Sequence, residues 1–382
     1  MCSVNSGPTS KMRSVARGNL VLSGLRVARN NRSALLLAIG YLCLSVPAAA
    51  QQGHGPSKQR HESRDIEAVL WRDPTDMTSR NLFYGPGGKE DQPQGTTFTY
   101  EKEDLHGTSP KFDVRDQDNV KWRVKLGEEA RPETAATRLL WAVGYSTNED
   151  YFVERIQVNG MQAVSKKRRK RAQGLLDSDG TMHGVRLKRY SKGKKKVGTW
   201  QWRKNPFTGS QELNGLRVMM AVINNWDLTD DNNSIYEEEK CDGTAKQQQD
   251  SDDLRVYVVS DVGASFGTTG RVRDRAVAKG NSDAYRRSKF ISKIGRDYVD
   301  FAVPSRESWV LVVNPKEYIR RLRLRWIGRH IPRSDAKWAG RLLARLSTEQ
   351  VRDAFRAAGY SPEQVDQFSE VVAQRIAALN DL

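Results

Sequence analysis

The chain has 382 residues, of which 37% are hydrophobic and 29% are charged. This composition excludes a wholly disordered chain, because the apolar fraction is large enough to form a core. The formal net charge of +17 favours contact with anionic partners such as nucleotide phosphates, lipid headgroups or anionic glycans. A well-solvated basic surface would have the same composition, so the charge alone does not identify a partner.

Residues 1–50 have the layout of a secretory signal peptide. They contain six basic residues and no acidic residue, and the apolar run at 33–50, SALLLAIGYLCLSVPAAA, ends in small residues before Gln51. This order predicts a signal that is cleaved during export to the periplasm or the extracellular space. A membrane anchor is the alternative, but the apolar core is short for a bilayer span, so we expect no transmembrane segment after cleavage.

The remainder, roughly 330 residues, is long enough for one large domain or two modest lobes. Of the three cysteines, Cys2 and Cys43 lie in the predicted signal and only Cys241 follows it. The exported chain is therefore predicted to have no internal disulfide. Residues 51–66 are polar, and we expect a flexible lead-in there.

The first clear elements after the lead-in are a strand and a helix. The strand is predicted at 120–126, VKWRVKL, where apolar residues alternate with basic ones that include Lys125. The helix is predicted at 131–144, with a proline near its start and a glycine at its end. Glu133 lies at the head of the apolar stripe of this helix, where a carboxylate needs a partner.

Two segments are strongly basic. Residues 165–196 contain SKKRRKR and RLKRYSKGKKK and are predicted to form a basic insertion, either a solvated loop or a contact for an anionic envelope surface. Export argues against nucleic acid as its partner. The stretch 319–329, IRRLRLRWIGR, is either an amphipathic surface helix or part of a C-terminal lobe, and we favour the second.

The second half of the chain is predicted to be mainly helical. A helix is expected at 213–225 and a buried strand at 254–260. From Asp335 onward the pattern is helical, and Ser347 and Ser361 are placed as N-caps.

The segment 224–233, NNWDLTDDNN, follows the first of these helices and carries Asp227 and, five residues later, Asn232. This D-x-x-x-x-N spacing suits phosphoryl transfer, in which the aspartate orients or deprotonates the attacking hydroxyl and the asparagine holds a metal beside the phosphates. A polar turn between a helix and a strand would use the same residue types. The alternative candidates within the segment are Asp230, Asp231 and Asn233.

Two further elements extend the pattern. The segment 260–267, SDVGASFG, places Asp261 at the end of the buried strand and before glycines, where a metal-binding aspartate is expected. Lys125 and Glu133 are a strand lysine and a helix glutamate that can pair and hold the lysine against phosphates. Each element alone has an ordinary explanation, but their order along the chain favours phosphoryl transfer.

These segments resemble parts of known kinases. Residues 122–145, WRVKLGEEARPETAATRLLWAVGY, resemble the strand-lysine and helix-glutamate segment of HipA-type serine/threonine kinases. NWDLTDDNN resembles the catalytic loop of those kinases and of phosphatidylinositol kinases. SDVGASFG resembles the metal-binding segment of the latter and of secretory-pathway atypical kinases. The resemblance covers residues 107–267.

The resemblance implies an α+β, two-lobed protein-kinase-like fold. A small β-rich N-terminal lobe with one helix would occupy 67–205, and a larger, mainly helical C-terminal lobe would occupy 206–382. ATP and Mg²⁺ would bind between the lobes. The implied site consists of Lys125 on the phosphates, Glu133 as its anchor, Asp227 as the base or orienting group, and Asn232 and Asp261 as metal ligands.

The chain has no G-x-G-x-x-G, so Gly85, Gly87 and Gly88 are the candidates for a phosphate-binding loop. The expected activity is phosphoryl transfer from a nucleotide to a hydroxyl of a protein, lipid or sugar. The alternative is a catalytically inactive envelope protein of the same fold that binds polyanions or has a structural role. A metal hydrolase is disfavoured, because the five histidines form no H-E-x-x-H. Residues 263–267, GASFG, approximate the G-x-S-x-G of serine hydrolases, an interpretation that we discount.

Overall fold

The computed structural model describes residues 67–382, except for 106–108, 191–192, 239–253, 270–278 and 305–309. The predicted signal peptide at 1–50, the lead-in at 51–66 and Cys241 lie outside the described residues. The described part is a mixed α/β structure that combines a closed barrel, open sheets and packed helices. No helix of this part is both long and apolar enough to cross a lipid bilayer.

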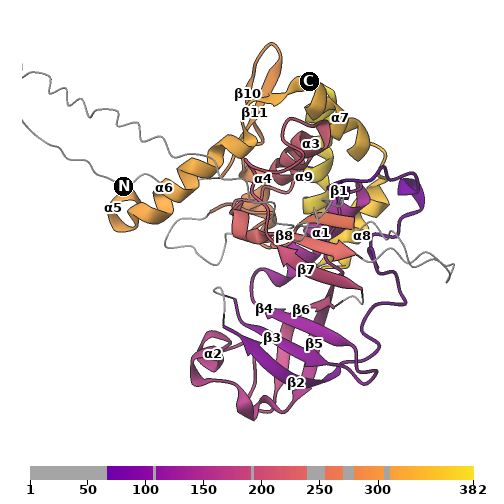
Figure 1. Ribbon diagram of the computed structural model, residues 1–382, viewed down its shortest axis with the longest axis vertical. Helices are drawn as coiled ribbons and strands as arrows, with labels where there is room; N and C mark the ends of the chain where they lie inside the picture. The colour runs from indigo at the N-terminus through magenta and orange to yellow at the C-terminus, as the bar shows by residue number, and fades with distance from the viewer. Residues whose placement is uncertain (1–66, 106–108, 191–192, 239–253, 270–278, 305–309) are drawn as a thin grey trace, which may run out of the picture. The chain divides into compact units, whose positions relative to one another are not determined.

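Five strands form the closed barrel in the order β2-β3-β4-β6-β5, drawn in the lower part of Figure 1. They are β2 (Thr97–Asp104), β3 (Lys111–Arg115), β4 (Lys121–Leu126), β5 (Asp150–Asn159) and β6 (Thr181–Arg189). A turn η2 (Met161–Ala163) and the short basic helix α2 (Lys166–Arg171) connect β5 to β6. The predicted alternation in β4 is confirmed, because Trp122, Val124 and Leu126 are buried in the barrel core.

The prediction of a basic insertion at 165–196 is wrong for its central part. Strand β6 runs through it and pairs antiparallel with both β4 and β5, so it closes the barrel. Val185 and Leu187 belong to the barrel core, whereas Arg186 and Lys188 line a cleft outside it. Basic residues at alternate positions gave the segment the composition of a solvated loop, although Val185, Arg186 and Leu187 are all buried.

The second sheet has the strand order β1-β9-β8-β7. Its strands are β1 (Glu67–Val69), β7 (Lys194–Gly198), β8 (Asn233–Glu238) and β9 (Leu254–Val259). β1 pairs parallel with β9, and the other neighbours pair antiparallel. The predicted buried strand at 254–260 is confirmed as β9, in which every residue except Arg255 is buried. This strand ends two residues before Asp261.

The helices pack mainly into one large hydrophobic core, in the upper part of Figure 1. They are α1 (Ala130–Ala142), α3 (Gln211–Val222), α4 (Ser282–Arg287), α5 (Val310–Val313), α6 (Pro315–Leu324), α7 (Arg333–Leu343), α8 (Thr348–Arg356) and α9 (Pro362–Asn380), with the short 3-10 turns η1 (Met77–Ser79), η3 (Asp230–Asn232) and η5 (Arg325–Gly328). A small sheet of β10 (Ile291–Ile294), β11 (Tyr298–Phe301) and β12 (Ile331–Pro332) contacts α3 and α7.

Serine hydroxyls begin the two C-terminal helices. The predicted N-caps Ser347 and Ser361 are confirmed, and each forms a capping box with a glutamine three residues later, Gln350 and Gln364. Each box satisfies two main-chain amides that the helix itself leaves without a partner. The helices therefore begin at positions that local sequence determines.

Helix α1 joins the barrel to the helical core. It contacts β5 and β6 on one side and α8 on the other. The helix predicted at 131–144 is α1, which begins one residue earlier than predicted, at Ala130, and ends two residues earlier, at Ala142. Gly144 follows in a left-handed conformation, with φ of +96°, and a Cβ there would lie 2.2 Å from the carbonyl oxygen of Arg72. Only glycine therefore fits this helix end.

The predicted division at 67–205 and 206–382 does not coincide with the hydrophobic cores. The barrel strands, between 97 and 189, enclose a core of their own. Leu70 before the barrel and Trp200 after it belong to the large core that also contains the C-terminal helices. From residue 67 onward, the described chain therefore starts in the large core, forms the barrel, and then returns to the large core.

Candidate functional site

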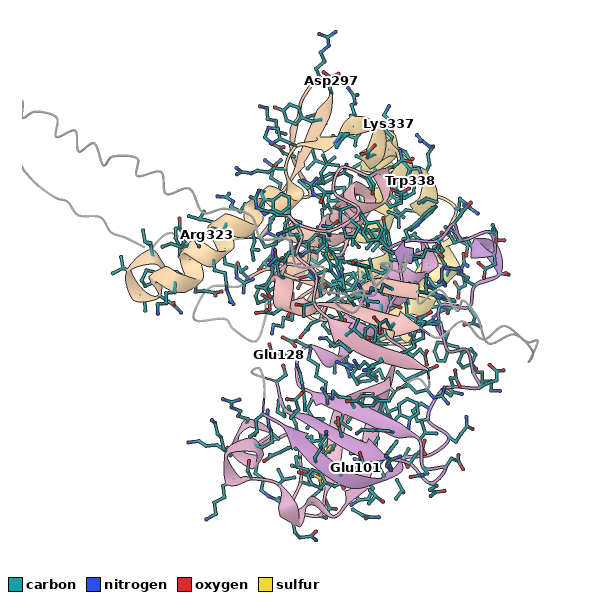
Figure 2. The ribbon with its side chains drawn as sticks, in the orientation of Figure 1. Glu101, Glu128, Asp297, Arg323, Lys337 and Trp338 are labelled. Carbon is teal, nitrogen blue, oxygen red and sulfur yellow. The ribbon has the colours of Figure 1, made fainter. Side chains whose placement is uncertain are left out.

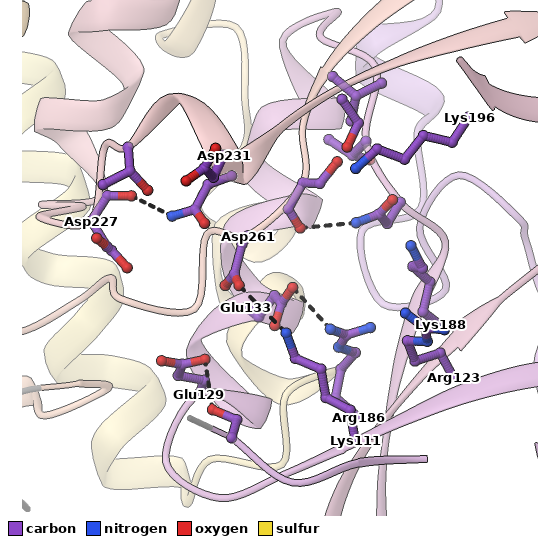
Figure 3. A pocket seen from close by; sticks show the side chains of 18 of the residues that line it. Lys111, Arg123, Glu129, Glu133, Arg186, Lys188, Lys196, Asp227, Asp231 and Asp261 are labelled. Atoms are coloured by element: carbon purple, nitrogen blue, oxygen red, sulfur yellow. Dashed lines mark hydrogen bonds and ion pairs between the residues drawn. The ribbon is translucent and has the colours of Figure 1, made fainter. Parts of the chain in front are cut away.

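A cleft with a volume of about 1460 Å³ lies outside the barrel. Its walls come from strands β3, β4 and β6 of the barrel, strands β7, β8 and β9 of the second sheet, the loop after α3, and helices α1 and α6. Segments far apart in the sequence thus meet around one space (Figure 3). The described residues that line it include four of the predicted site residues, Glu133, Asp227, Asn232 and Asp261.

Lys125 is completely buried and is not among the described residues that line the cleft, although it contacts three that are. Its Nζ atom lies 2.6 Å from Glu129 Oε2, 2.8 Å from Glu133 Oε2 and 2.9 Å from Asp261 Oδ1. Burial alone would lower the pKa of Lys125, but the three carboxylates outweigh it and raise the pKa well above its ordinary value. The lysine is therefore a fixed cation at the junction of the barrel, helix α1 and strand β9.

Glu133 binds two cations. Its second oxygen, Oε1, accepts a hydrogen bond of 3.0 Å from Arg186 on β6, and Arg186 also lies 3.3 Å from Asp150. Arg186 is buried, and although burial alone would lower its pKa, Glu133 and Asp150 raise the pKa above its usual range. Each carboxylate in this buried set has a cationic partner, although at Glu133 burial outweighs Arg186 and Lys125 and raises the pKa above its ordinary value.

Sequence reasoning did not identify Glu129 and Arg186. Glu129 lies four residues after Lys125 and also binds Lys279, which lines the cleft. Burial alone would raise the pKa of Glu129, but Lys125 and Lys279 hold it well below its ordinary value. A signal for Arg186 was present, because it alternates with buried aliphatic residues in β6, but the surrounding basic residues obscured it.

The loop after α3 is held in shape by its own polar groups. Asn232 donates from Nδ2 to the carbonyl oxygen of Asp227 at 2.7 Å, and Asn225 Oδ1 accepts from the Asp227 amide at 2.9 Å. The Asn232 carbonyl accepts from the amides of Ser260 and Asp261, at 2.9 and 3.3 Å. These main-chain bonds tie the loop to the end of β9, so Asn232 and Asp261 are neighbours across the cleft floor.

Among the alternatives within the loop, two have other partners. Asp230 Oδ1 accepts from the amide of Trp202 at 3.0 Å, and Asn233 donates to the carbonyl of Trp200 at 3.1 Å and is fully buried. Asp231 lines the cleft together with Asp227 and Asn232. The geometry therefore favours Asp227 with Asn232 and leaves Asp231 as the remaining acidic alternative.

Helix α6 brings a cation to Asp227 that sequence reasoning also missed. Arg321 Nη1 lies 3.1 Å from Asp227 Oδ1, and the same guanidinium lies over the ring of Trp226. Arg321 is buried and also pairs with Glu317 at 2.8 Å. No local pattern distinguishes Arg321 from the other arginines of IRRLRLRWIGR, because its role depends on a contact with a loop about ninety residues away.

The candidate phosphate loop does not reach the cleft. Gly85, Gly87 and Gly88 are not among the described residues that line it. A Cβ at Gly85 would meet the guanidinium of Arg138, and the carbonyl of Gly88 accepts from the hydroxyl of Tyr151 at 3.2 Å. These glycines form a tight turn against α1 and β5, and their assignment to nucleotide phosphates is corrected.

Three aspartates and three basic side chains face each other across the cleft. In Figure 3, Asp227, Asp231 and Asp261 lie on one side, and Arg123, Lys188 and Lys196 lie on the other. We call the second group, with Lys111, the basic wall. Lys111 Nζ lies 4.0 Å from Asp261 Oδ2, so the wall begins beside the acidic group. Burial alone would raise the pKa of Asp261, but Lys125 lowers it below the ordinary value.

The G-x-S-x-G spacing at 263–267 is complete rather than approximate, but it is not a nucleophile site. Ser265 is fully buried, and its hydroxyl donates to the carbonyl of Val262 at 2.7 Å. A catalytic serine must present its oxygen to a substrate and a base. The serine of this turn instead stabilises the backbone that follows Asp261.

Comparison with known proteins gives no relative. The chain matches no protein-family model, no curated protein and no solved structure. The described residues contain no group of three or more histidine, cysteine, aspartate or glutamate side chains arranged to hold a metal. Any argument about function therefore depends on the chemistry of the cleft itself.

Proposed function

We propose that the protein is an exported phosphotransferase with a two-lobed, kinase-like arrangement that transfers a phosphoryl group from ATP to a hydroxyl acceptor. One observation carries the proposal: a buried lysine, Lys125, binds Asp261, and Asp261 is joined through its main chain to Asn232 of the D-x-x-x-x-N loop. These are the residue types that phosphoryl transfer needs: Asn232 and Asp261 line the cleft, and Lys125 is buried in contact with Asp261.

Each residue then has a chemical role. Lys125 would meet phosphate oxygens when Asp261, whose side chain is 33% exposed, turns from the lysine toward the cleft. Glu133 stays with the lysine because it is buried between Lys125 and Arg186. Asp227 would accept a hydrogen bond from the attacking hydroxyl, align it, and take its proton as the bond to phosphorus forms.

The oxygen atoms near the loop suit Mg²⁺. Magnesium prefers hard oxygen ligands and usually takes only one or two protein groups beside water and phosphate. Asp261 supplies a carboxylate, and Asn232 supplies an amide oxygen whose orientation is set by the bond from its Nδ2 to Asp227. Bound there, the metal would neutralise charge on the phosphates.

The basic wall replaces the glycine loop in this proposal. Lys111, Arg123 and Lys188 lie on barrel strands β3, β4 and β6 and line the cleft. A rigid sheet can present such cations to phosphate without a flexible cover, because neighbouring strands place them side by side.

The same wall supports a second candidate, a non-catalytic envelope protein that binds polyanions. ATP is not expected to be plentiful outside the cytoplasm, which favours this candidate. It predicts anion binding that weakens with salt and does not depend on a divalent metal.

A thermal-shift titration of the full chain with ATP, with and without Mg²⁺, tests the first candidate. We expect a saturable rise in Tm that requires the metal, since a ligand present at about a hundred times its Kd stabilises by about 2.7 kcal/mol. Asp261→Ala should remove the metal-dependent part, and Asp283→Ala, an exposed carboxylate on α4, should retain it. A shift that is the same without Mg²⁺, or that survives Asp261→Ala, supports the polyanion-binding candidate instead.

A further inference from the structure

The two most exposed aliphatic residues of the described chain lie on α5, and three further exposed ones lie on α5 and α6. Val312 and Val313 are 85% and 71% exposed, and Leu311, Ile319 and Leu322 are each at least 39% exposed. Figure 2 shows this helical segment, marked by Arg323, carrying side chains into open space beside the remainder of the described chain. Contiguous exposed apolar residues of this kind mark an interaction surface.

Helix α6 has three faces. Glu317, Arg321 and Leu324 face the protein, because Arg321 is buried on Asp227 and Leu324 packs against the large core. Ile319 and Leu322, three residues apart, lie on the opposite side and are exposed.

The third face lies between these two and is basic. Lys316, Arg320 and Arg323 follow at intervals of four and three residues, so they share one side of the helix, and all three are exposed. Glu317 is the acidic residue of α6, and it is paired with both Arg320 and Arg321. The outer surface of the segment therefore combines an aliphatic face with an adjacent face of positive charge.

We propose that α5 and α6 bind the surface of a membrane that contains anionic lipids. A helix that lies in the interface inserts aliphatic side chains among the lipid chains while its lysines and arginines contact headgroup phosphates. Protein interfaces are instead centred on aromatic anchors, and the exposed apolar residues here are valine, leucine and isoleucine.

The contact would place the cleft near the lipid surface. Arg320 belongs to the basic face and also lines the cleft, and Arg321 of the same helix binds Asp227. Membrane binding by α5 and α6 does not depend on phosphoryl transfer, so each proposal can fail without the other.

Co-sedimentation of the full chain with lipid vesicles tests the proposal. Vesicles of phosphatidylcholine alone are compared with vesicles that also contain phosphatidylglycerol, at low and high salt. We expect binding to the anionic vesicles that weakens as salt rises, because salt screens the attraction between the basic face and the headgroup phosphates.

Three variants separate the contributions. Two double variants should each weaken vesicle binding by at least about tenfold. The first replaces the aliphatic face, Val312→Glu with Val313→Glu, and the second replaces the basic face, Lys316→Glu with Arg323→Glu. Ile294→Glu, at an aliphatic residue on β10 that is 55% exposed, should bind as the unaltered chain does. All substituted positions are exposed, so the variants should keep the Tm of the unaltered protein.

Several outcomes would overturn the proposal. Binding that survives both pairs of substitutions would arise from another part of the chain. Equal binding to neutral and anionic vesicles would remove the role of the basic face. The protein could also bind no vesicle and instead show self-association in light scattering. If the double variant Val312→Glu, Val313→Glu abolishes that self-association, the surface contacts a second copy of the chain.

Discussion

Lys125 Nζ and Asp261 Oδ1 lie 2.9 Å apart, although 136 residues separate them in the chain. The barrel strand β4 supplies the lysine and the end of β9 supplies the aspartate. Because the lysine is buried and the carboxylate is one-third exposed, the pair joins the protein interior to the cleft. Lys125 therefore contributes to stability and holds in place a carboxylate that lines the cleft.

Lys125→Met should destabilise the fold. The substitution leaves Glu129, Glu133 and Asp261 without their shared cation, and removing one partner of a buried ion pair costs about 3–5 kcal/mol. Chemical denaturation followed by tryptophan fluorescence measures the change. Lys167→Met, at an exposed lysine of α2, is the control and should change the free energy of unfolding by less than about 0.5 kcal/mol. A loss below 1 kcal/mol for Lys125→Met would contradict the buried charge network.

Asp227→Asn should separate binding from chemistry. The amide keeps the shape of the carboxylate but cannot accept a proton, so ATP turnover should fall by about 10²–10⁴-fold while the metal-dependent thermal shift remains. Phosphate release and self-phosphorylation report the turnover. Asp231→Asn tests the remaining acidic residue of the loop. If turnover falls for Asp231→Asn and not for Asp227→Asn, the two assignments must be exchanged.

Glu129→Gln should make the free energy of unfolding depend less on pH in the acid range. Lys125 and Lys279 hold the folded pKa of Glu129 below the unfolded value of about 4.3, so the folded state binds fewer protons. Its stabilising contribution is therefore complete above about pH 5 and is lost as the pH falls toward the folded pKa. In denaturant titrations, the difference in the free energy of unfolding between the unaltered chain and Glu129→Gln should therefore become smaller from pH 6 to pH 3.

The neighbouring carboxylate provides the control for that experiment. Glu128 is exposed, and Glu128→Gln should leave the free energy of unfolding at neutral pH within about 0.5 kcal/mol of the unaltered chain. If the difference in the free energy of unfolding caused by Glu129→Gln stays constant or grows as the pH falls, then the two lysines do not lower the pKa of Glu129.

Ser361→Ala should cost about 1 kcal/mol, because it removes the hydroxyl that caps α9 and one half of the capping box. Thermal or chemical unfolding measures the loss. Thr348→Ala, at the first exposed position of α8, removes a hydroxyl of similar size that does not cap a helix, and its effect should be near zero or slightly stabilising. Equal losses in the two variants would show that the box contributes nothing.

Local patterns predicted the local structure well. The alternation in 120–126, the helix that contains Glu133 and the serine caps depend on neighbours within a few residues, so the sequence contains their causes. The convergence of Lys125 with Asp261 was also anticipated, from the order of motifs rather than from any contact.

Other parts of the site depend on distant packing, which local patterns do not record. The role of Arg186 follows from its place on a barrel strand, and that of Arg321 from the position of α6 beside the loop. The glycines at 85–88 were misassigned because a tight turn against Arg138 and a phosphate loop need the same backbone freedom. Composition could not distinguish these environments.

The parallel pairing of β1 with β9 has a consequence for how the polypeptide is made. Residues 67–69 find their partner strand only after residue 254 has left the ribosome, so this sheet cannot close on an incomplete nascent chain. A fragment that stops after the barrel would leave β1 and Leu70 unpaired and prone to aggregate. Such delayed closure would leave the chain extended during synthesis, as passage through a translocation channel would require if the predicted export takes place.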